Sequence, residues 1–282
     1  MQPVRPVKTF AADPNDMTPV RPIRTLAGYI GGKRQLSGML CERIAAIPHS
    51  IYCEPFVGMG GVFFKRASAP KVEAINDLSR DVAGLFRILQ RHYQPFLDML
   101  KWQVTSRAEF ERLAAQDPDT LTDLERAARF LYLQKLSFGG KVAGRTFGID
   151  TGSPARFDIT RLATLLEAAH ERLAGVWIEC LPYDRFIERW DRPSTLFYVD
   201  PPYWGTEHYY GKDAFSRDDF QRLADTLRDI QGRFILTVND VPEIREIFAF
   251  AEIEQADLTY TAGGNGKAKA VTEIIITNRE KS

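Results

Sequence analysis

Short apolar runs alternate with longer amphipathic segments along most of the chain after Leu26. Apolar residues spaced about 3.6 apart predict helices, and short apolar runs bounded by turn residues predict buried strands. The predicted strands are 50–55, 72–77, 176–181, 195–199, 233–239, 252–260 and 271–277. The predicted helices are a segment that ends at 66, a helix from 79 past 89, and 106–115, 121–136, 160–173, 184–190, 216–230 and 241–249.

Strands that alternate with helices are typical of a mostly parallel sheet with helices on both faces. The last two predicted strands have no helix between them, which predicts an antiparallel hairpin. Residues 88–159 break the alternation, because they are first helical and then rich in glycine and basic residues. We therefore expect an α/β fold in which 25–87 and 160–282 form one sheet domain and 88–159 form an inserted lobe.

Residues 1–24 lack apolar periodicity and carry two near copies of one motif, PVRPVKT and PVRPIRT. Proline fixes φ and removes a backbone donor, so we expect an extended or disordered arm. Met17 opens the second copy and is an alternative start of the natural chain. A phosphate-binding arm is the functional alternative.

The composition of the 282-residue chain excludes several classes of protein. The formal net charge is zero, so bulk charge does not point to nucleic acid. The three cysteines are odd in number and have no paired spacing, which argues against a disulfide framework and a zinc site. The four histidines do not have the spacing of metal ligands. No apolar run reaches the roughly 20 residues that span a membrane, and the N-terminus lacks a secretory signal. We expect a cytoplasmic protein without a metal.

One stripe of basic residues departs from the neutral total. The segment 126–149 contains five basic residues and no acid. A solvated helix face followed by a loop is one interpretation, and contact with an anionic partner is the other. The basic residues are Arg126, Arg129, Lys135, Lys141 and Arg145.

A glycine-rich turn, EPFVGMGG, follows the first predicted strand at 54–61. Such a turn lets the backbone approach a ligand closely. Its spacing is GxGG rather than GxGxxG, and the GK[ST] of a phosphate-binding loop is absent. Asp77 ends the next strand, where an acid can accept both hydroxyls of a ribose. The pair favours an adenosine-bearing ligand, and the alternative is a tight turn followed by a helix-capping acid.

The upstream segment YIGGK, residues 29–33, places two glycines before a lysine. This pattern indicates a loop that brings a cation to an anion, and a simple surface turn is the alternative.

The segment FYVDPPYWG, residues 197–205, lies just beyond a predicted strand, where open α/β sheets bind ligands. Pro202 stiffens the turn, so the Asp200 carboxylate and the Pro201 carbonyl can face one point. A planar amine with two N–H donors fits that point, and Tyr203 can lie flat against its ring. Two acceptors draw such an amine toward tetrahedral geometry and free its lone pair. The alternative is a rigid turn with core aromatics, and Trp204 stays open as pocket wall, DNA contact or packing.

The order of YIGGKRQL, FVGMGG, IND and DPPYW resembles the Dam-type (D12 class) DNA adenine N6-methyltransferases over about 26–278. The resemblance implies a Rossmann-like sheet, S-adenosylmethionine as methyl donor, and double-stranded DNA whose target adenine is flipped out. It implies a site-specific adenine methyltransferase that works in the cytoplasm on the nucleoid. Its implied catalytic residues are Asp200, Pro201, Pro202 and Tyr203.

The resemblance also assigns the cofactor. It implies that the glycine turn cradles the methionine part, that Asp77 holds the ribose, and that Tyr183 with Asp184 contacts the adenine. The implied cofactor-binding residues are Tyr29, Lys33, Glu54, Phe56, Gly58, Gly60, Asp77, Tyr183, Asp184 and Asp200.

The resemblance makes 88–159 the target-recognition lobe and implies that 261–269 form a hairpin loop near DNA, with Asn239 and Asp240 on the same rim. Cytosine N4, RNA adenine or a glutamine amide are alternative substrates, and a catalytically inactive DNA-binding protein is a further alternative. The lobe differs from that of the best-known members, so the recognised site is not predicted. The oligomeric state and a partner restriction enzyme stay open too. The implied DNA contacts are Lys135, Lys141, Arg145, Lys267 and Lys269.

Overall fold

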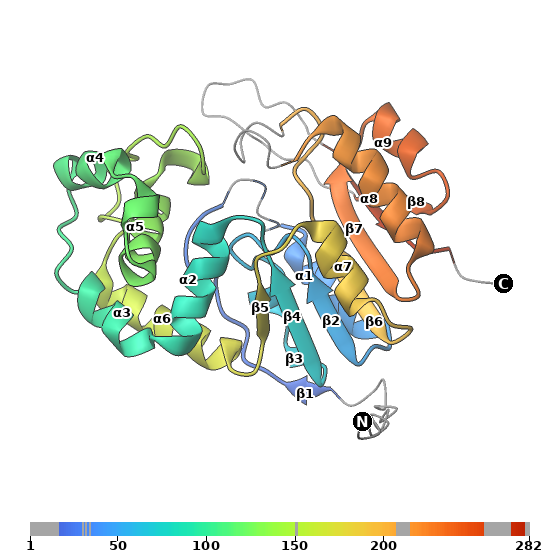
Figure 1. Ribbon diagram of the computed structural model, residues 1–282, viewed down its shortest axis with the longest axis horizontal. Coiled ribbons are helices and arrows are strands. Elements are labelled where there is room, and N and C mark those ends of the chain that lie inside the picture. Colours follow the sequence, from blue (N-terminus) through green and yellow to red (C-terminus); the bar gives the residue numbers. More distant parts are fainter. Residues whose placement is uncertain are drawn as a thin grey trace, which may run out of the picture.

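The computed structural model describes residues 17–29, 31, 33, 35–149, 152–206, 215–256 and 272–279. Its centre is a seven-stranded sheet in the order β5-β4-β2-β6-β7-β9-β8 (Figure 1). The first five strands of this order are parallel, and β9 runs antiparallel to both β7 and β8. This confirms the α/β class and the C-terminal antiparallel pair. The strands are β2 (Ile51–Glu54), β4 (Val72–Asn76), β5 (Trp177–Glu179), β6 (Thr195–Val199), β7 (Arg233–Asn239), β8 (Glu252–Ala256) and β9 (Glu273–Thr277).

Helices cover both faces of the sheet, because two separate apolar clusters pack on it. One cluster holds α1 and the helices of the lobe, and the other holds α7, α8 and α9. The helices are α1 (Ser37–Ala46), α2 (Arg80–Arg91), α3 (Tyr93–Leu100), α4 (Arg107–Ala115), α5 (Asp123–Leu136), α6 (Ile159–Leu173), α7 (Tyr183–Trp190), α8 (Arg217–Asp229) and α9 (Pro242–Ile247). None of the helices in the described part of the chain is long and apolar enough to cross a bilayer.

The helices near the N-terminus differ from the prediction in two places. The segment expected to be helical up to Arg66 forms only a single 3₁₀ turn at Phe63–Lys65. Two glycines of the preceding turn have positive φ, so a regular helix cannot begin there. Helix α1 was not predicted, because its buried apolar face is little more than Leu40 and Ile44, too short a pattern to detect.

The predicted helix caps are present. The Ser79 hydroxyl accepts from the Val82 N–H at 3.5 Å at the start of α2. Thr122 and Glu125 form the expected capping box, with Glu125 also accepting from the Thr122 N–H at 2.9 Å. These caps fix where α2 and α5 begin.

Helices α3 to α6 gather beyond the β5 edge of the sheet (Figure 1). Their apolar side chains belong to the same cluster as the buried face of α2, so the lobe and the sheet share one core. One buried amide ties the lobe to the N-terminal loop, because Gln134 Nε2 donates to the carbonyls of Gly28 and Gly140, each at 2.8 Å. Gly140 has φ 67°, and a Cβ there would lie 2.9 Å from the Gly28 carbonyl carbon. The lobe loop is thereby held against the segment that leads to Tyr29.

The end of the N-terminal arm is extended and ordered, which is the first of the two states expected for this arm. Thr18–Pro19 form β1, antiparallel to β3 (Ser68–Ala69). The backbone N–H groups of Val20 and Ile23 donate to the domain at 2.9 and 2.8 Å. Both donors find acceptors on the sheet domain, so the extended arm is held in place. Residues 1–16 lie outside the described part of the chain.

Candidate active site

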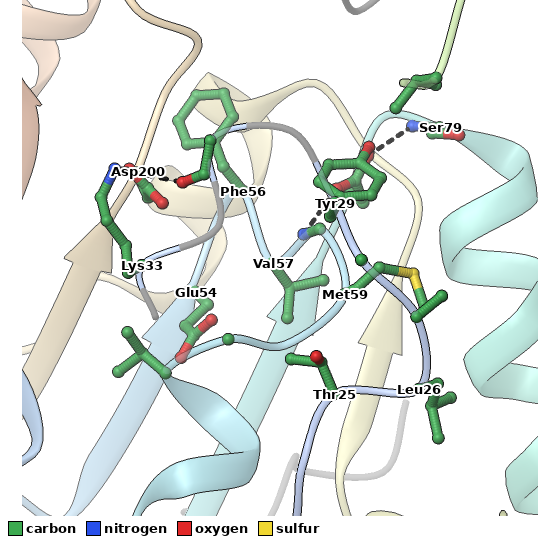
Figure 2. Close-up of a pocket in the computed structure, with 18 of the residues that line it drawn as sticks. Thr25, Leu26, Tyr29, Lys33, Glu54, Phe56, Val57, Met59, Ser79 and Asp200 are labelled. Carbon is green, nitrogen blue, oxygen red and sulfur yellow. Dashed lines mark hydrogen bonds and ion pairs between the residues drawn. The ribbon is translucent and has the colours of Figure 1, made fainter. Parts of the chain in front are cut away.

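A cavity of about 1790 Å³ opens at the carboxyl ends of the parallel strands. Asp77, after β4, lines one end, and Asp200, after β6, lines the other. Figure 2 shows the Lys33–Asp200 ion pair at one side and Ser79 at the other, with Tyr29 and Phe56 between them. Cavities that bind small molecules typically measure about 300–1,000 Å³, so this one has room for a cofactor and a second ligand.

Asp77 is held in place by backbone donors at its end of the cavity. The Gly58 N–H donates to Oδ2 and the Ser79 N–H donates to Oδ1, both at 2.9 Å. Burial raises the pKa of Asp77 to about 6, although both hydrogen bonds oppose the shift. Each carboxylate oxygen keeps a further lone pair, so Asp77 can accept two neighbouring hydroxyl groups.

Two of the three glycines of the turn, Gly58 and Gly60, have positive φ and lie in different surroundings. Gly58 lines the cavity with φ 50°, and a Cβ there would lie 3.1 Å from the Tyr29 ring. Gly60 does not line the cavity. With φ 71°, its missing side chain makes room for Phe64, whose ring atom would lie 2.6 Å from an added Cβ. Gly60 therefore shapes the turn, and its contact with a cofactor stays a prediction.

Three aromatic rings form a wall of the cavity. Phe56 lies 5.4 Å from Tyr183 and 5.8 Å from Phe215 between ring centroids. The Tyr183 hydroxyl donates to the Asp219 carbonyl at 3.3 Å, and burial raises the pKa of Tyr183 to about 12, so the phenol stays neutral. Asp184 lines the same wall. A wall of this kind suits the face of a flat aromatic ring such as adenine.

Asn76 fixes the start of that wall. Its Nδ2 donates to the carbonyls of Pro55 and Leu181 at 2.9 and 3.0 Å, and its Oδ1 accepts from the Leu181 N–H at 2.9 Å. The carboxyl ends of β2, β4 and β5 are thus joined by one buried amide. Asn76 was not among the predicted site residues, although a polar residue that ends an apolar strand is a usable signal.

The lysine of the GGK loop meets Asp200. Lys33 Nζ lies 2.7 Å from Asp200 Oδ1 and donates to the Tyr203 hydroxyl oxygen at 2.8 Å. The expected pairing of a cation with an anion is therefore present, and the anion is Asp200 itself. The Thr237 hydroxyl donates to the same oxygen at 3.0 Å. Burial raises the pKa of Asp200, and Lys33 opposes that shift.

A second acid completes this group and was missed in the sequence. Glu273, the first residue of β9, is fully buried and accepts a hydrogen bond from the Tyr203 hydroxyl. Its Oε2 lies 3.7 Å from Lys33 Nζ. Burial raises the pKa of Glu273, and the charge of Lys33 opposes that shift. The acid in the apolar run EIIIT was its only sequence signal.

The turn that carries Asp200 is anchored from outside. Asn239 Oδ1 accepts from the Trp204 N–H at 2.8 Å, and Asn239 Nδ2 donates to the Trp204 carbonyl at 3.2 Å. The Trp204 ring packs 5.2 Å from Phe220 of α8. Pro201 and Pro202 are buried, and Pro202 lines the cavity. Packing, one of the three roles left open for Trp204, is therefore observed.

Glu54 is a buried acid on the cavity wall. Its Oε1 accepts from the Tyr52 hydroxyl at 2.7 Å. Burial raises the pKa of Glu54 to about 8, so this side chain is mostly protonated at neutral pH. A cationic ligand group beside it would favour the ionised form.

The basic residues expected at DNA occupy different surroundings. Lys135 lines the cavity, and burial, with Arg24 nearby, lowers its pKa. Arg145 is half-buried, with Nη2 donating to Gln134 Oε1 at 3.3 Å and its guanidinium 5.4 Å from the Phe130 ring centroid. Lys141 is half-buried in the loop after α5. Lys267 and Lys269 lie outside the described residues.

The cavity suits S-adenosylmethionine by the chemistry of its donors and acceptors. Asp77 offers acceptors for a ribose, the aromatic wall offers a surface for a base, and Glu54 and Asp200 offer acids for cationic groups. Among the described residues, no group of three or more His, Cys, Asp or Glu side chains could hold a metal ion.

Comparison with known proteins places these features in a family. The family model of the D12 class N6 adenine-specific DNA methyltransferases matches residues 29–262. The type II methyltransferase M1.LlaDCHI of Lactococcus lactis subsp. cremoris is 25% identical over 89% of this chain and 93% of its own length. The type II methyltransferase M.CviBI of Paramecium bursaria Chlorella virus NC1A is 22% identical over 71% of this chain and 76% of its own length. The retron Ec67 DNA adenine methylase of Escherichia coli is 24% identical over 89% of this chain and 90% of its own length.

Proposed function

Because the chain belongs to the D12 class N6 adenine-specific DNA methyltransferase family, we propose that it methylates the N6 amine of adenine in DNA with S-adenosylmethionine as donor. The observation that carries the proposal is the Asp200 turn, which faces the same cavity as the ribose-type acceptor Asp77. The groups proposed to bind the cofactor and the groups proposed to activate the amine thus line the same cavity. Two of the three relatives are named type II methyltransferases, which supports a place in restriction–modification.

The cofactor would lie between the two ends of the cavity. Asp77 would accept the ribose hydroxyls, and Phe56 with Tyr183 would pack on the adenine ring. Glu54 and Asp200 would face the cationic methionine part. When bound, S-adenosylmethionine supplies an electrophilic methyl group on a positively charged sulfur.

The Asp200 turn would bind and activate the amine. The Asp200 carboxylate and the Pro201 carbonyl accept the two N6 hydrogens, and Tyr203 lies against the base. These acceptors pull electron density back onto the nitrogen, whose lone pair is otherwise delocalised into the ring. Asp200 stabilises the positive charge that develops on N6, and water takes the proton afterwards. Most of the acceleration comes from holding the reacting atoms in line.

The target base has to leave the duplex to reach this turn. Flipping a base costs a few kcal/mol, which stacking on aromatic side chains in the pocket offsets. The size of the cavity supports this step, because it exceeds what a cofactor alone fills. Lys135 on its wall and Lys141 in the lobe loop would contact phosphates. In this proposal the lobe 88–159 selects the target.

The direct test incubates the purified protein with labelled S-adenosylmethionine and unmethylated DNA, followed by mass spectrometry of the digested nucleosides. We expect label in N6-methyladenine. Label in N4-methylcytosine, or only in RNA, would instead identify one of the other planar amines as the substrate. Cofactor binding without any transfer would support an inactive DNA-binding protein on the same scaffold.

Cofactor affinity should depend on pH through Asp77. Its pKa is raised to about 6, so the carboxylate is ionised above that pH and protonated below it. Protonation removes acceptor capacity for the ribose, and affinity should fall as the pH drops from 7 to 5. Calorimetric titrations across this range measure the effect, and the Asp77→Asn variant should lose the dependence. An equally steep fall in Asp77→Asn would assign the dependence to another group.

Lys141→Ala should weaken DNA binding and reduce its salt dependence. Each phosphate contact contributes about 0.9 to the slope of log affinity against log salt concentration. The matched control is Lys101→Ala, because Lys101 is a lobe lysine already paired with Asp98 at 2.6 Å. Fluorescence anisotropy at several salt concentrations gives both slopes. A slope in Lys141→Ala equal to that of the control would remove Lys141 from the interface.

A further inference from the structure

The mechanism above leaves Glu273 without a role. This acid is fully buried in the first position of β9, and burying a charge costs several kcal/mol unless partners compensate it. Its Oε1 accepts from the Tyr203 hydroxyl. Its Oε2 has no hydrogen-bond partner within the described part of the chain, and the nearest cation is Lys33, at 3.7 Å. Such a residue is retained at a cost to stability, which calls for a functional reason.

Lys33 reduces the negative charge that Asp200 presents to a ligand, and an ionised Glu273 can compensate for this. The Lys33 ammonium lies 2.7 Å from the Asp200 oxygen, so its positive charge offsets the negative charge of Asp200. A positive charge that develops on an amine is stabilised more strongly by a carboxylate whose own charge is not offset by a neighbouring cation. Asp200 and Lys33 alone are neutral as a pair. With an ionised Glu273, the three groups together carry a single negative charge.

We propose that Glu273 is the buried counter-ion of Lys33, and that it leaves the charge of Asp200 available to the substrate amine and to the sulfonium of the cofactor. Glu273 is a positioning residue, because it acts through Lys33 and Tyr203 and faces neither ligand directly. The inference rests on the proposed methyltransferase function, which it extends to a residue outside the family motifs quoted above.

The geometry allows the lysine to move between the two acids. A shift of about 1 Å would bring Lys33 Nζ from 3.7 Å into hydrogen-bond range of Glu273 Oε2. Asp200 Oδ1 would then be free for an amine hydrogen, while Thr237 continues to orient it. Tyr203 stays bonded to Glu273 in either position, so the ring that holds the base keeps its place.

The first test compares single-turnover methyl transfer to DNA at saturating cofactor. Glu273→Gln keeps the shape and an acceptor for Tyr203 but removes the charge, and we expect a rate about 10- to 100-fold lower. Adding Lys33→Met restores the net negative charge, so the double variant should be faster than Glu273→Gln alone. A double variant as slow as Glu273→Gln, or slower, would overturn the proposal, because two structural losses add.

A second comparison does not need the single variant to fold. In the Lys33→Met background Glu273 has no cation to neutralise, so adding Glu273→Gln should leave the rate unchanged or raise it. A structural role for Glu273 requires a lower rate instead. Glu254→Gln on β8 is the matched control, because Glu254 is exposed and pairs with Arg43 at 2.6 Å.

A binding measurement separates this inference from the proposed function. Calorimetry without DNA gives the affinities for S-adenosylmethionine, which carries a sulfonium, and for S-adenosylhomocysteine, which carries a neutral thioether. The preference for the sulfonium should fall several-fold in Glu273→Gln and return in the double variant, and an unchanged preference would contradict the inference. A wild-type protein that binds both ligands yet methylates no DNA would overturn the proposed substrate, while this ratio would still test Glu273.

Discussion

Asp200→Ala should lower the rate of methyl transfer to DNA by about 10³-fold, the scale found when one group that stabilises transition-state charge is removed. Asp200 holds the only side-chain carboxylate of the turn that faces the cavity, and no other acceptor on that turn carries charge. Cofactor affinity should change far less, because Asp77 and the aromatic wall lie at the other end. Single-turnover rates and calorimetric affinities separate the two effects.

The control for this variant is Asp225→Ala, which removes an exposed acid of α8 that pairs with Arg228 at 3.0 Å. It should leave transfer and binding unchanged. The fold should survive the loss of Asp200, because Lys33 keeps Tyr203 and Glu273 as partners. Turnover by Asp200→Ala within about 10-fold of the wild type would rule out the amine-activation mechanism.

Asp77→Ala should weaken S-adenosylmethionine binding by about 10- to 100-fold, since two hydrogen bonds to an ionised acceptor would be lost. Stability should fall too, by about 1–3 kcal/mol, because the N–H groups of Gly58 and Ser79 lose their acceptor. Calorimetry gives the affinity, and thermal unfolding without ligand gives the stability.

Ser106→Ala is the matched control for the loss of stability. The Ser106 hydroxyl caps α4 in the lobe by accepting from the Glu109 N–H at 3.1 Å, and removing a cap costs about 1 kcal/mol. This variant should unfold more easily yet bind cofactor normally. If Asp77→Ala binds as tightly as Ser106→Ala, then Asp77 supports the turn only and does not hold the ribose.

The element order of the sheet domain was predictable because its signals are local. Strands buried on both faces are short continuous apolar runs, and β6 and β7 have the predicted bounds. The capping box at Thr122 marked the start of α5 in the same way. Helix α1 escaped prediction, because its apolar face is short. The choice between an extended and a disordered arm could not be predicted, because the arm is held by backbone hydrogen bonds to a segment that is distant in the sequence.

The placement of the site was predictable to the same extent. Parallel strands carry ligands at their carboxyl ends, so Asp77 and Asp200 were expected at one edge of the sheet, and both line one cavity there. The roles assigned to the site residues remain predictions. At Gly60 the motif predicts a cofactor contact, and the structure adds that the missing side chain makes room for Phe64.

The sequence by itself determined the order along the chain of the strands of the central sheet, the positions of most helices, and the presence of an acid–proline turn after a buried strand. It could not determine which charged groups meet, because Lys33, Asp200 and Glu273 lie far apart in the chain with no shared periodicity. The tertiary structure decided that, by setting β9 beside β7 and β7 beside β6. Strand order follows from packing of the whole sheet, and only there do two acids come to share one lysine.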